Sequence, residues 1–371
     1  MAPAVSRRLR YLPLAIGAAA LIAGFWTGLA RIGIAVPNLD QLDAWHGPLM
    51  ISGFFGTLIS LERAVALNRP FAYAAPTLSA VGALALLFNA PMPAIVLFIL
   101  ASAVLTIATA VILVRLPTLF TAVLTLAAAA WGIGTLAWLG GRPMGEVTGW
   151  WLAFLVLTIA AERLELSRLL APSRWAQAFF VAAIALIVAG AARGELASDS
   201  APLTAVGYLA CTAWLVVHDI ARRTVRQSGQ TRFSATCMLA GYFWLGVTGL
   251  YLLVSPPASA AFAYDAAVHG IALGFVLSMV FGHALIILPA VTGVAVRYHP
   301  ALYGALALLH LSVALRIVSD FFEWVGPRAA SGPLTIAALL VFAATVAIAS
   351  LKRRADGGLR SAHTEPRPNR N

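Results

Sequence analysis

Residues 265–293 read DAAVHGIALGFVLSMVFGHALIILPAVTG, and this stretch decides the fold. It is apolar over most of its length and is long enough to cross the hydrocarbon core of a bilayer as an α-helix. Two histidines interrupt it, His269 near its start and His283 further along. An imidazole in a membrane span is costly unless it has a partner, so both are candidates for a functional site. On an ideal helix they lie about 21 Å apart along the axis and about 40° apart around it, so one metal ion cannot bind both.

The composition gives the same class for the whole chain. Its 371 residues are 61% hydrophobic and 11% charged, and long apolar runs recur throughout. This predicts an all-α polytopic membrane protein. Cys211 and Cys237 lie far apart inside predicted helices, so neither a disulfide framework nor a cysteine metal site is predicted. The first apolar region is too long for a signal peptide and has no clear cleavage site, so we expect it to be the first span.

Apolar runs bounded by Pro, Gly and charged residues predict twelve transmembrane helices. They cover residues 9–32, 45–67, 71–90, 92–115, 118–139, 146–169, 175–193, 202–222, 233–255, 261–291, 299–320 and 332–351. Residues 1–354 are expected to form a single transmembrane domain. Residues 355–371 are polar and basic, which predicts a disordered cytoplasmic tail.

The basic residues predict the orientation. The net charge of +11 would suit a nucleic-acid partner, but the arginines lie in short loops at the membrane edges. With the N-terminus in the cytoplasm, the 25 Lys and Arg residues all fall on the cytoplasmic side except Arg31, Arg142, Arg193, Arg316 and Arg328. This bias predicts a multi-pass protein of the bacterial inner membrane with both termini in the cytoplasm. Lipid is then a partner and nucleic acid is not.

His46 opens the second predicted helix, in WHGPLMISGFFG, residues 45–56. The second and tenth helices both begin at the outer face, so His46 and His269 lie at the same depth. Two histidines so placed could ligate one haem iron from both sides, and the alternative is two unrelated polar residues at the interface. Gly47 and Gly270 follow them, and we expect these glycines to let a bulky ring approach the backbone.

Three further residues could serve the same site. Arg316 and Arg31 lie toward the outer ends of their helices and could pair with haem propionates. Each could equally be an interface arginine whose head reaches toward water. Asp265 is one helical turn before His269, so it could hydrogen-bond that histidine or face water.

A second polar group lies near the cytoplasmic ends of the second and sixth helices. It comprises Glu62, Arg63, Glu162, Arg163, Glu165 and Arg168, and His283 could join it. It could be an ion-paired collar that fixes helix packing, or a proton-loading or second metal site. His310, in the middle of the eleventh helix, is either a packing residue or a ligand. His283 and His310 could also bind copper weakly.

These residues resemble subunit I of the haem-copper oxidases. His269, the run GFVLSMVFG at residues 274–282, Leu288-Pro289 and Gly293 are similar to that family's tenth helix, and HGPLMI from His46 is similar to its other low-spin haem segment. The resemblance implies twelve helices in three arcs of four, with a low-spin haem b held by two histidines.

Departures from the family restrict the implied activity. Ala267 stands where the oxidases have the ligand of their high-spin haem, and residues 146–169 and 175–193 contain no histidine for copper. An oxygen-reducing or NO-reducing centre is therefore not expected. In size, helix count and scattered histidines the chain resembles NnrS, a haem membrane protein of nitric-oxide metabolism, although the Trp-Thr-Gly motif after the second helix is absent.

The resemblance implies electron transfer or a nitric-oxide-related role, with a c-type cytochrome or a quinone as redox partner. Two other functions stay open from the residues themselves. One is a haem, metal or proton-coupled transporter, in which the histidines and the collar line a pathway. The other is a structural membrane subunit whose polar residues only pair helices.

The charge distribution makes the topology testable with reporter fusions. Fusions at Arg226 and Arg370 should report the cytoplasm, and fusions at Ala201 and Arg328 should report the outside, because cytoplasmic loops retain basic residues. An external C-terminus would contradict the orientation and the equal depth of His46 and His269.

Overall fold

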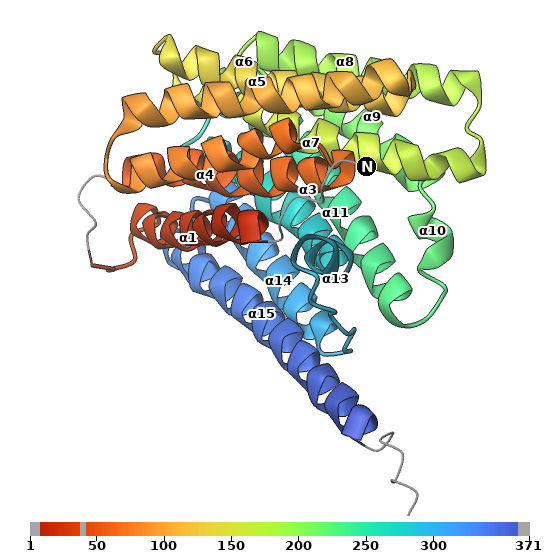
Figure 1. Ribbon diagram of the computed structural model, residues 1–371. Coiled ribbons are helices and arrows are strands. Elements are labelled where there is room, and N and C mark those ends of the chain that lie inside the picture. Colours follow the sequence, from red (N-terminus) through yellow and green to blue (C-terminus); the bar gives the residue numbers. More distant parts are fainter. Residues whose placement is uncertain (1–7, 38–41, 363–371) are drawn as a thin grey trace, which may run out of the picture.

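The computed structural model describes residues 8–37 and 42–362. All secondary structure in these residues is helical, which confirms the predicted all-α class (Figure 1). Eleven helices in the described residues are long and apolar enough to cross a membrane, and a twelfth, Pro202–His218, is apolar but shorter. The chain is therefore a multi-pass membrane protein.

Each of the twelve predicted ranges corresponds to one helical segment. The first six are α1 (Arg8–Arg31), the span Leu42–Leu67, the span Pro70–Leu87 that contains α4 (Ala74–Leu87), α5 (Pro91–Arg115), α6 (Leu119–Leu139) and α7 (Met144–Ser167). The others are α8 (Arg174–Ala192), α9 (Pro202–His218), α11 (Gly229–Val254), the span Ala263–Thr292, α14 (Leu302–Phe321) and α15 (Val325–Ala362). A short helix, α10 (Ala221–Thr224), connects α9 to α11.

The last helix differs most from its prediction. It begins at Val325, before the predicted start at residue 332, and continues to Ala362. Residues 355–362, which the sequence assigns to the disordered tail, are thus helical, and residues 363–371 lie outside the described part. Pro333 lies inside this helix, about two turns after its start, and the helix continues past it.

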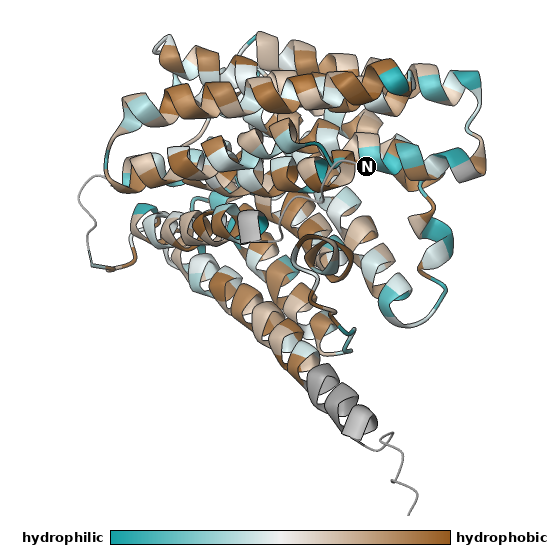
Figure 2. Cartoon of the chain, viewed as in Figure 1, coloured by the Kyte–Doolittle hydropathy of each residue, from teal (hydrophilic) through white to brown (hydrophobic). Residues whose placement is uncertain are grey.

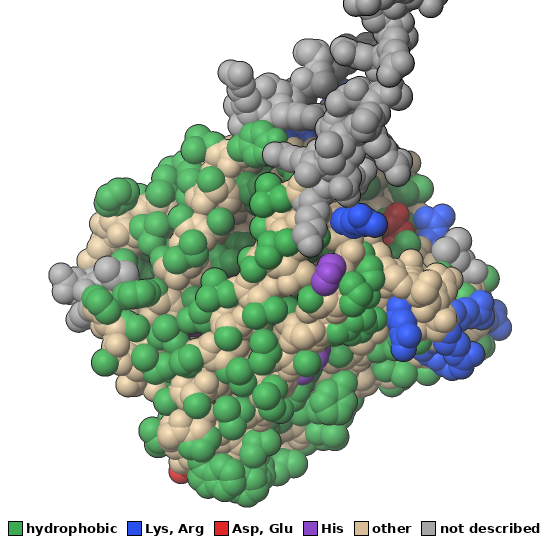
Figure 3. Space-filling view, turned by 90° about the horizontal axis from the view of Figure 1, so that it is seen from below, with side chains coloured by type: hydrophobic (Ala, Val, Ile, Leu, Met, Phe, Trp, Pro, Cys, Tyr) green, Lys and Arg blue, Asp and Glu red, His purple; other side chains and the backbone are tan. Residues whose placement is uncertain are grey.

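The surface suits a lipid environment. Large apolar side chains such as Leu12, Ile22 and Val114 are exposed at 67%, 69% and 82%, which hydrocarbon tolerates and water does not. Apolar residues cover the helices along most of their length (Figure 2). On the face shown in Figure 3 the basic side chains gather at one end of the molecule. In Figure 1, α1 begins and α15 ends toward the same side of the bundle.

The core is centred on α7. In its most apolar stretch 72% of the residues are buried, whereas in that of α15 only 22% are. Large aromatic side chains fill the space around it. Trp131 and Phe154 stack with ring centroids 5.4 Å apart, and Trp151 meets Trp138 edge-on at 5.7 Å. A second apolar cluster joins α11, the span Ala263–Thr292, α14 and α15.

Two spans contain π-helical segments, and each segment lies just after a candidate histidine. His46 begins α2 (His46–Pro48), which leads into the π-helix η2 (Leu49–Gly56) and then α3 (Thr57–Leu67). His269 ends α12 (Ala263–His269), which leads into the π-helix η6 (Gly270–Leu277) and then α13 (Ser278–Thr292). Such segments are rare and are frequent at functional sites. They change the rotation along each helix, so the ideal-helix angle between His269 and His283 does not apply.

Close packing against η2 makes one glycine necessary. A Cβ atom at Gly56 would lie 2.7 Å from Cζ2 of Trp131, which is fully buried and donates a hydrogen bond of 3.0 Å to Ser52 Oγ. Gly56→Ala should therefore destabilise the protein by about 1–3 kcal/mol, as overpacked cores do. Thermal melting of the detergent-purified protein would measure this loss.

Gly304→Ala is the matched control, because a Cβ atom there would meet nothing within 4 Å. In the helical α14 it should leave the melting temperature unchanged or raise it slightly. Equal melting temperatures for the two variants would contradict the packing described for Trp131.

Candidate functional site

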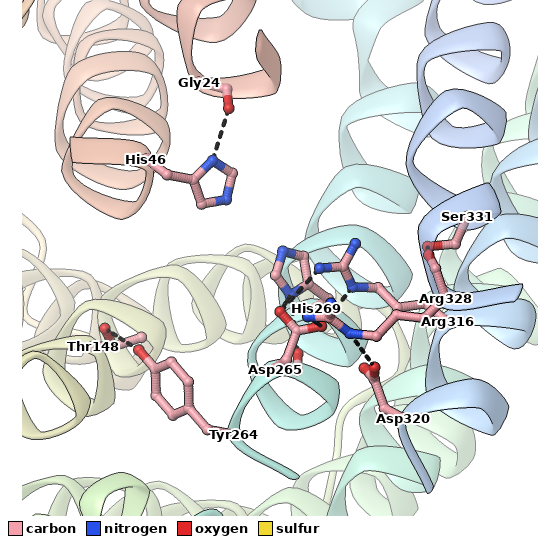
Figure 4. A network of polar contacts seen from close by, with 10 residues as sticks. All are labelled: Gly24, His46, Thr148, Tyr264, Asp265, His269, Arg316, Asp320, Arg328 and Ser331. Carbon is pink, nitrogen blue, oxygen red and sulfur yellow. Dashed lines mark hydrogen bonds and ion pairs between the residues drawn. The ribbon is translucent and has the colours of Figure 1, made fainter. Parts of the chain in front are cut away.

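The structure brings His46 and His269 together. Their ring centroids are 6.1 Å apart and their planes make an angle of 23°. Both rings line a cavity of about 640 Å³ between α1, the two histidine-bearing spans, α14 and the start of α15. Figure 4 shows the two rings on opposite sides of the open space, with charged residues beside His269.

Hydrogen bonds fix the tautomer of each ring. Nδ1 of His46 lies 2.7 Å from the Gly24 carbonyl oxygen, and Nδ1 of His269 lies 2.9 Å from the Asp265 carbonyl oxygen. A carbonyl oxygen can only accept, so each Nδ1 carries the proton. Each neutral imidazole then has its lone pair on Nε2. Neither Nε2 has a hydrogen-bond partner among the described residues, so both lone pairs are available to a ligand.

The separation of the rings suits one metal ion between them. A metal–imidazole bond is about 2.0–2.1 Å long and the ring centre lies about 1 Å behind the nitrogen, so two axial imidazoles on one ion have centres about 6 Å apart. The observed 6.1 Å agrees with this distance. The cavity volume is also in the range of protein sites for cofactors, about 300–1,000 Å³.

Glycines on α1 place the His46 ring. Gly24 and Gly28 are four residues apart and so share one face of the helix. A Cβ atom at Gly28 would lie 2.9 Å from Cε1 of His46, and one at Gly24 would lie 2.4 Å from the sulfur of Met50. The bare helix face thus lets the ring lie against the backbone that its Nδ1–H binds.

The expected role of the glycines after the histidines holds only in part. Gly47 lines the cavity, and a Cβ atom there would meet nothing within 4 Å. Gly270 faces α11 instead, where a Cβ atom would lie 2.2 Å from Oγ1 of Thr248. The expectation for Gly270 was wrong because this glycine serves helix packing rather than the cavity.

A buried ionic network supports His269. Arg316 donates two hydrogen bonds to Asp265, from Nε to Oδ2 at 2.8 Å and from Nη2 to Oδ1 at 2.9 Å. Asp265 Oδ1 also lies 3.2 Å from Nδ1 of His269, so the carboxylate contacts the histidine as well as the arginine. Arg328 bridges two carboxylates, with Nη2 3.3 Å from Asp265 Oδ2 and Nε 2.8 Å from Asp320 Oδ1. The network joins α12, α14 and α15.

The rest of the cavity is apolar with a few polar groups. Arg31, Arg316 and Arg328 all line it, and Arg31 is the exposed member, with Nη1 3.3 Å from the Asp43 carbonyl oxygen. Tyr264 donates a 2.8 Å hydrogen bond to Oγ1 of Thr148 at the opposite wall. Most of the remaining lining is apolar and includes Phe25, Met50, Phe55, Leu273 and Leu277.

The second polar group is a set of paired side chains. Arg63 forms ion pairs with Glu162 and, at 3.2 Å, with Glu62. Nη2 of Arg163 lies 2.9 Å from Nε2 of His283, whose Nδ1 donates to the Met279 carbonyl oxygen at 2.8 Å. The lone pair of His283 is therefore used by Arg163, and the cluster ties α3 and α7 to α13.

His310 lies apart from this cluster and from the cavity. Its Nδ1 accepts a 2.8 Å hydrogen bond from Nε1 of Trp244, so Nε2 carries the proton of the neutral ring. His283 and His310 thus both have their lone pairs engaged. In residues 8–37 and 42–362 no group of three or more His, Cys, Asp or Glu side chains could hold a metal ion.

Sequence reasoning missed Arg328 and Asp320 as members of the site. Arg328 reads as one more basic residue in an outer loop, and Asp320 as a helix-end carboxylate. Two signals pointed to the arrangement. Arg328 is one of only five basic residues outside the predicted cytoplasmic side, and Gly24 and Gly28 have the spacing of a close helix contact.

Comparison with known proteins identifies the family. The model of a family described as "Domain of unknown function (DUF8744)" matches residues 8–351. The comparison with curated proteins gave no match, and the comparison with solved structures gave none either. The likeness to haem-copper oxidase subunit I and to NnrS, with its three arcs of helices, therefore stays a prediction from the quoted residues.

The network makes Asp265 important for stability. Asp265→Ala would leave the guanidinium of Arg316, whose side chain is only 8% exposed, without its two carboxylate bonds. Loss of one partner of a buried pair should cost about 3–5 kcal/mol. Melting of the purified protein would show the change, with Arg142→Ala as control, since that arginine is 61% exposed in its pair with Glu146 and should cost at most about 1 kcal/mol. Similar losses in both variants would contradict the buried network.

Proposed function

The chain belongs to the DUF8744 family, and we propose that it is a haem-binding membrane protein in which His46 and His269 are the two axial ligands of one haem b. In this proposal the protein carries single electrons near the outer face of the membrane. The observation that carries it is the pair of imidazoles 6.1 Å apart, each with its proton fixed on Nδ1 and its lone pair free on Nε2.

The surroundings of the two histidines fit the same cofactor. Haem is an apolar disc with two carboxylates at one edge, and the cavity has apolar walls together with Arg31, Arg316 and Arg328. Arginine pairs with carboxylates through its planar fork, so these side chains would bind the propionates. Arg31 is the most available, because Arg316 and Arg328 also hold Asp265.

The protein residues then have separate tasks. The Gly24 and Asp265 carbonyl oxygens keep each Nδ1 protonated and orient the rings, as partners of metal-bound histidines do. The Asp265 carboxylate adds a negative charge beside His269 alone. Apolar side chains such as Phe55 and Leu273 exclude water. Haem would supply a one-electron couple.

Two bound histidines favour electron transfer over binding of a gas. His46 and His269 would together hold the iron, which would then have no free site for oxygen or nitric oxide. Ala267 and the lack of histidine in α7 and α8 support a single haem without an oxidase centre. We propose that the partner is a c-type cytochrome or a quinone. We also propose that the protein lies in the bacterial inner membrane with both termini in the cytoplasm.

Absorption spectra of the purified protein, oxidised and dithionite-reduced, test the proposal. The wild type should show the sharp reduced α-band of a low-spin haem, with about one haem per chain. His46→Ala and His269→Ala should each abolish or severely reduce haem retention, because one imidazole alone cannot complete the low-spin site.

His218→Ala is the control, since that histidine lies at the end of α9, outside the cavity, with Nδ1 3.2 Å from the Trp214 carbonyl oxygen. It should keep the wild-type spectrum. A colourless wild type after expression with added haem precursor, or normal spectra in both ligand variants, would refute the proposal.

A further inference from the structure

We infer that Asp320 is a proton-binding site that takes up one proton when the haem site gains an electron. The inference rests on the proposed function and extends it from electron transfer to coupled electron and proton transfer. It is carried by one buried carboxylate oxygen that has no partner.

Asp320 lies one residue before the end of α14, and its side chain is 0% exposed. Oδ1 accepts a 2.8 Å hydrogen bond from Nε of Arg328. Oδ2 is buried and has no hydrogen-bond partner among the described residues. An ionised oxygen without a donor is costly to bury, and a proton on Oδ2 would remove that cost.

Asp265 is the less suitable acceptor. Both of its oxygens already accept from Arg316, and Oδ2 is also 3.3 Å from Arg328. A proton on Asp265 would displace an arginine, whereas a proton on Asp320 Oδ2 displaces nothing. Arg328 bridges the two carboxylates, and Asp265 also acts on Asp320 directly, so a charge change at one reaches the other.

Other charged or titratable groups that face Asp320 come from four elements. Its own helix contributes Arg316, with Glu323 just beyond its end, α15 contributes Arg328, and α12 contributes Asp265 and, behind it, His269. Tyr251 from α11 faces it with a hydroxyl oxygen that is buried and has no hydrogen-bond partner among the described residues. Glu323 is exposed, so water screens it and it is left out of the charge balance below; Arg31 is exposed as well but is counted, because the proposed function pairs it with a propionate.

The charges of the haem-bound site balance in one redox state only. Arg31, Arg316 and Arg328 supply three positive charges, and Asp265, Asp320 and two propionates supply four negative ones. Ferric iron in the dianionic porphyrin adds one positive charge, so the oxidised site is neutral. An electron from a one-electron donor leaves one negative charge uncompensated in a medium of low dielectric constant.

The coupled step is balanced in charge and atoms. One electron enters from the donor, one proton enters from water at the outer end of α14, and an O–H bond forms at Asp320 Oδ2. No bond breaks in the protein. The site is then neutral in both redox states, and oxidation releases the same proton to the same side.

Redox titration of the haem-loaded protein in lipid nanodiscs, from pH 5 to 9, tests the inference. Protonation favours the reduced state, so the wild-type midpoint potential should fall as pH rises. Where uptake is complete, each pH unit changes the redox equilibrium tenfold, which is about 59 mV. Asp320→Asn should remove this slope, because the neutral amide imitates the protonated acid. Its potential should stay near the value that the wild type reaches at low pH.

Glu323→Gln is the matched control, since it removes an exposed carboxylate three residues away and should keep the wild-type slope. The reduced-minus-oxidised infrared spectrum of the wild type gives a second measurement, in which reduction should produce a carboxylic-acid C=O band. This measurement serves if Asp320→Asn does not retain haem.

A pH-independent wild-type potential, a slope that persists in Asp320→Asn, or the absence of the infrared band would overturn the inference. These results differ from failure of the proposed function. A haem protein with a flat potential refutes only the role of Asp320, whereas a chain that binds no haem refutes both.

Discussion

The bidentate pair between Arg316 and Asp265 is the interaction on which the rest of the site depends. It places a carboxylate beside Nδ1 of His269 and holds α14 against α12. A lone buried carboxylate or guanidinium would carry a large desolvation cost. The pair offsets this cost only if both hydrogen bonds form. Arg328 brings α15 to the same carboxylate, so the cavity wall and the ligand position are fixed by one cluster.

Different interactions hold the two histidines, but both leave the lone pair on Nε2 free. His46 donates to the carbonyl of Gly24 on another helix, so its position depends on how α1 packs against η2. His269 donates to the carbonyl of Asp265 within its own helix and depends on the ionic cluster instead. In both cases the free lone pair is directed away from the supporting backbone. The site therefore requires correct packing on one side and correct charge pairing on the other.

The sequence was sufficient for the helices and for the pairing of His46 with His269. Apolar length and the placement of arginines determine depth, and equal depth on two spans limits which polar residues can meet. The sequence did not predict that Arg328 and Asp320 belong to the site, or that Gly270 faces α11 rather than the cavity. Those depend on how helices rotate about their axes, and the π-helical segments η2 and η6 change that rotation without a clear sequence signal.

The two polar clusters on these spans show how buried polar groups divide between packing and ligand binding. In the inner cluster Arg63 pairs with Glu162 and Arg163 donates to Nε2 of His283, so His283 keeps no lone pair for a ligand, while Nε of Arg63 and Nε of Arg163 are buried donors without a hydrogen-bond partner. In the cluster at the cavity, the hydrogen bonds of His46 and His269 use Nδ1 and leave the lone pair of Nε2 free, and Oδ2 of Asp320 is buried without a hydrogen-bond partner. A buried polar atom without a hydrogen-bond partner destabilises the folded state, so a purely structural role would not explain its presence. Unused acceptor atoms, rather than charge or depth, thus separate the candidate site from the collar, where the buried atoms without a partner are arginine N–H donors.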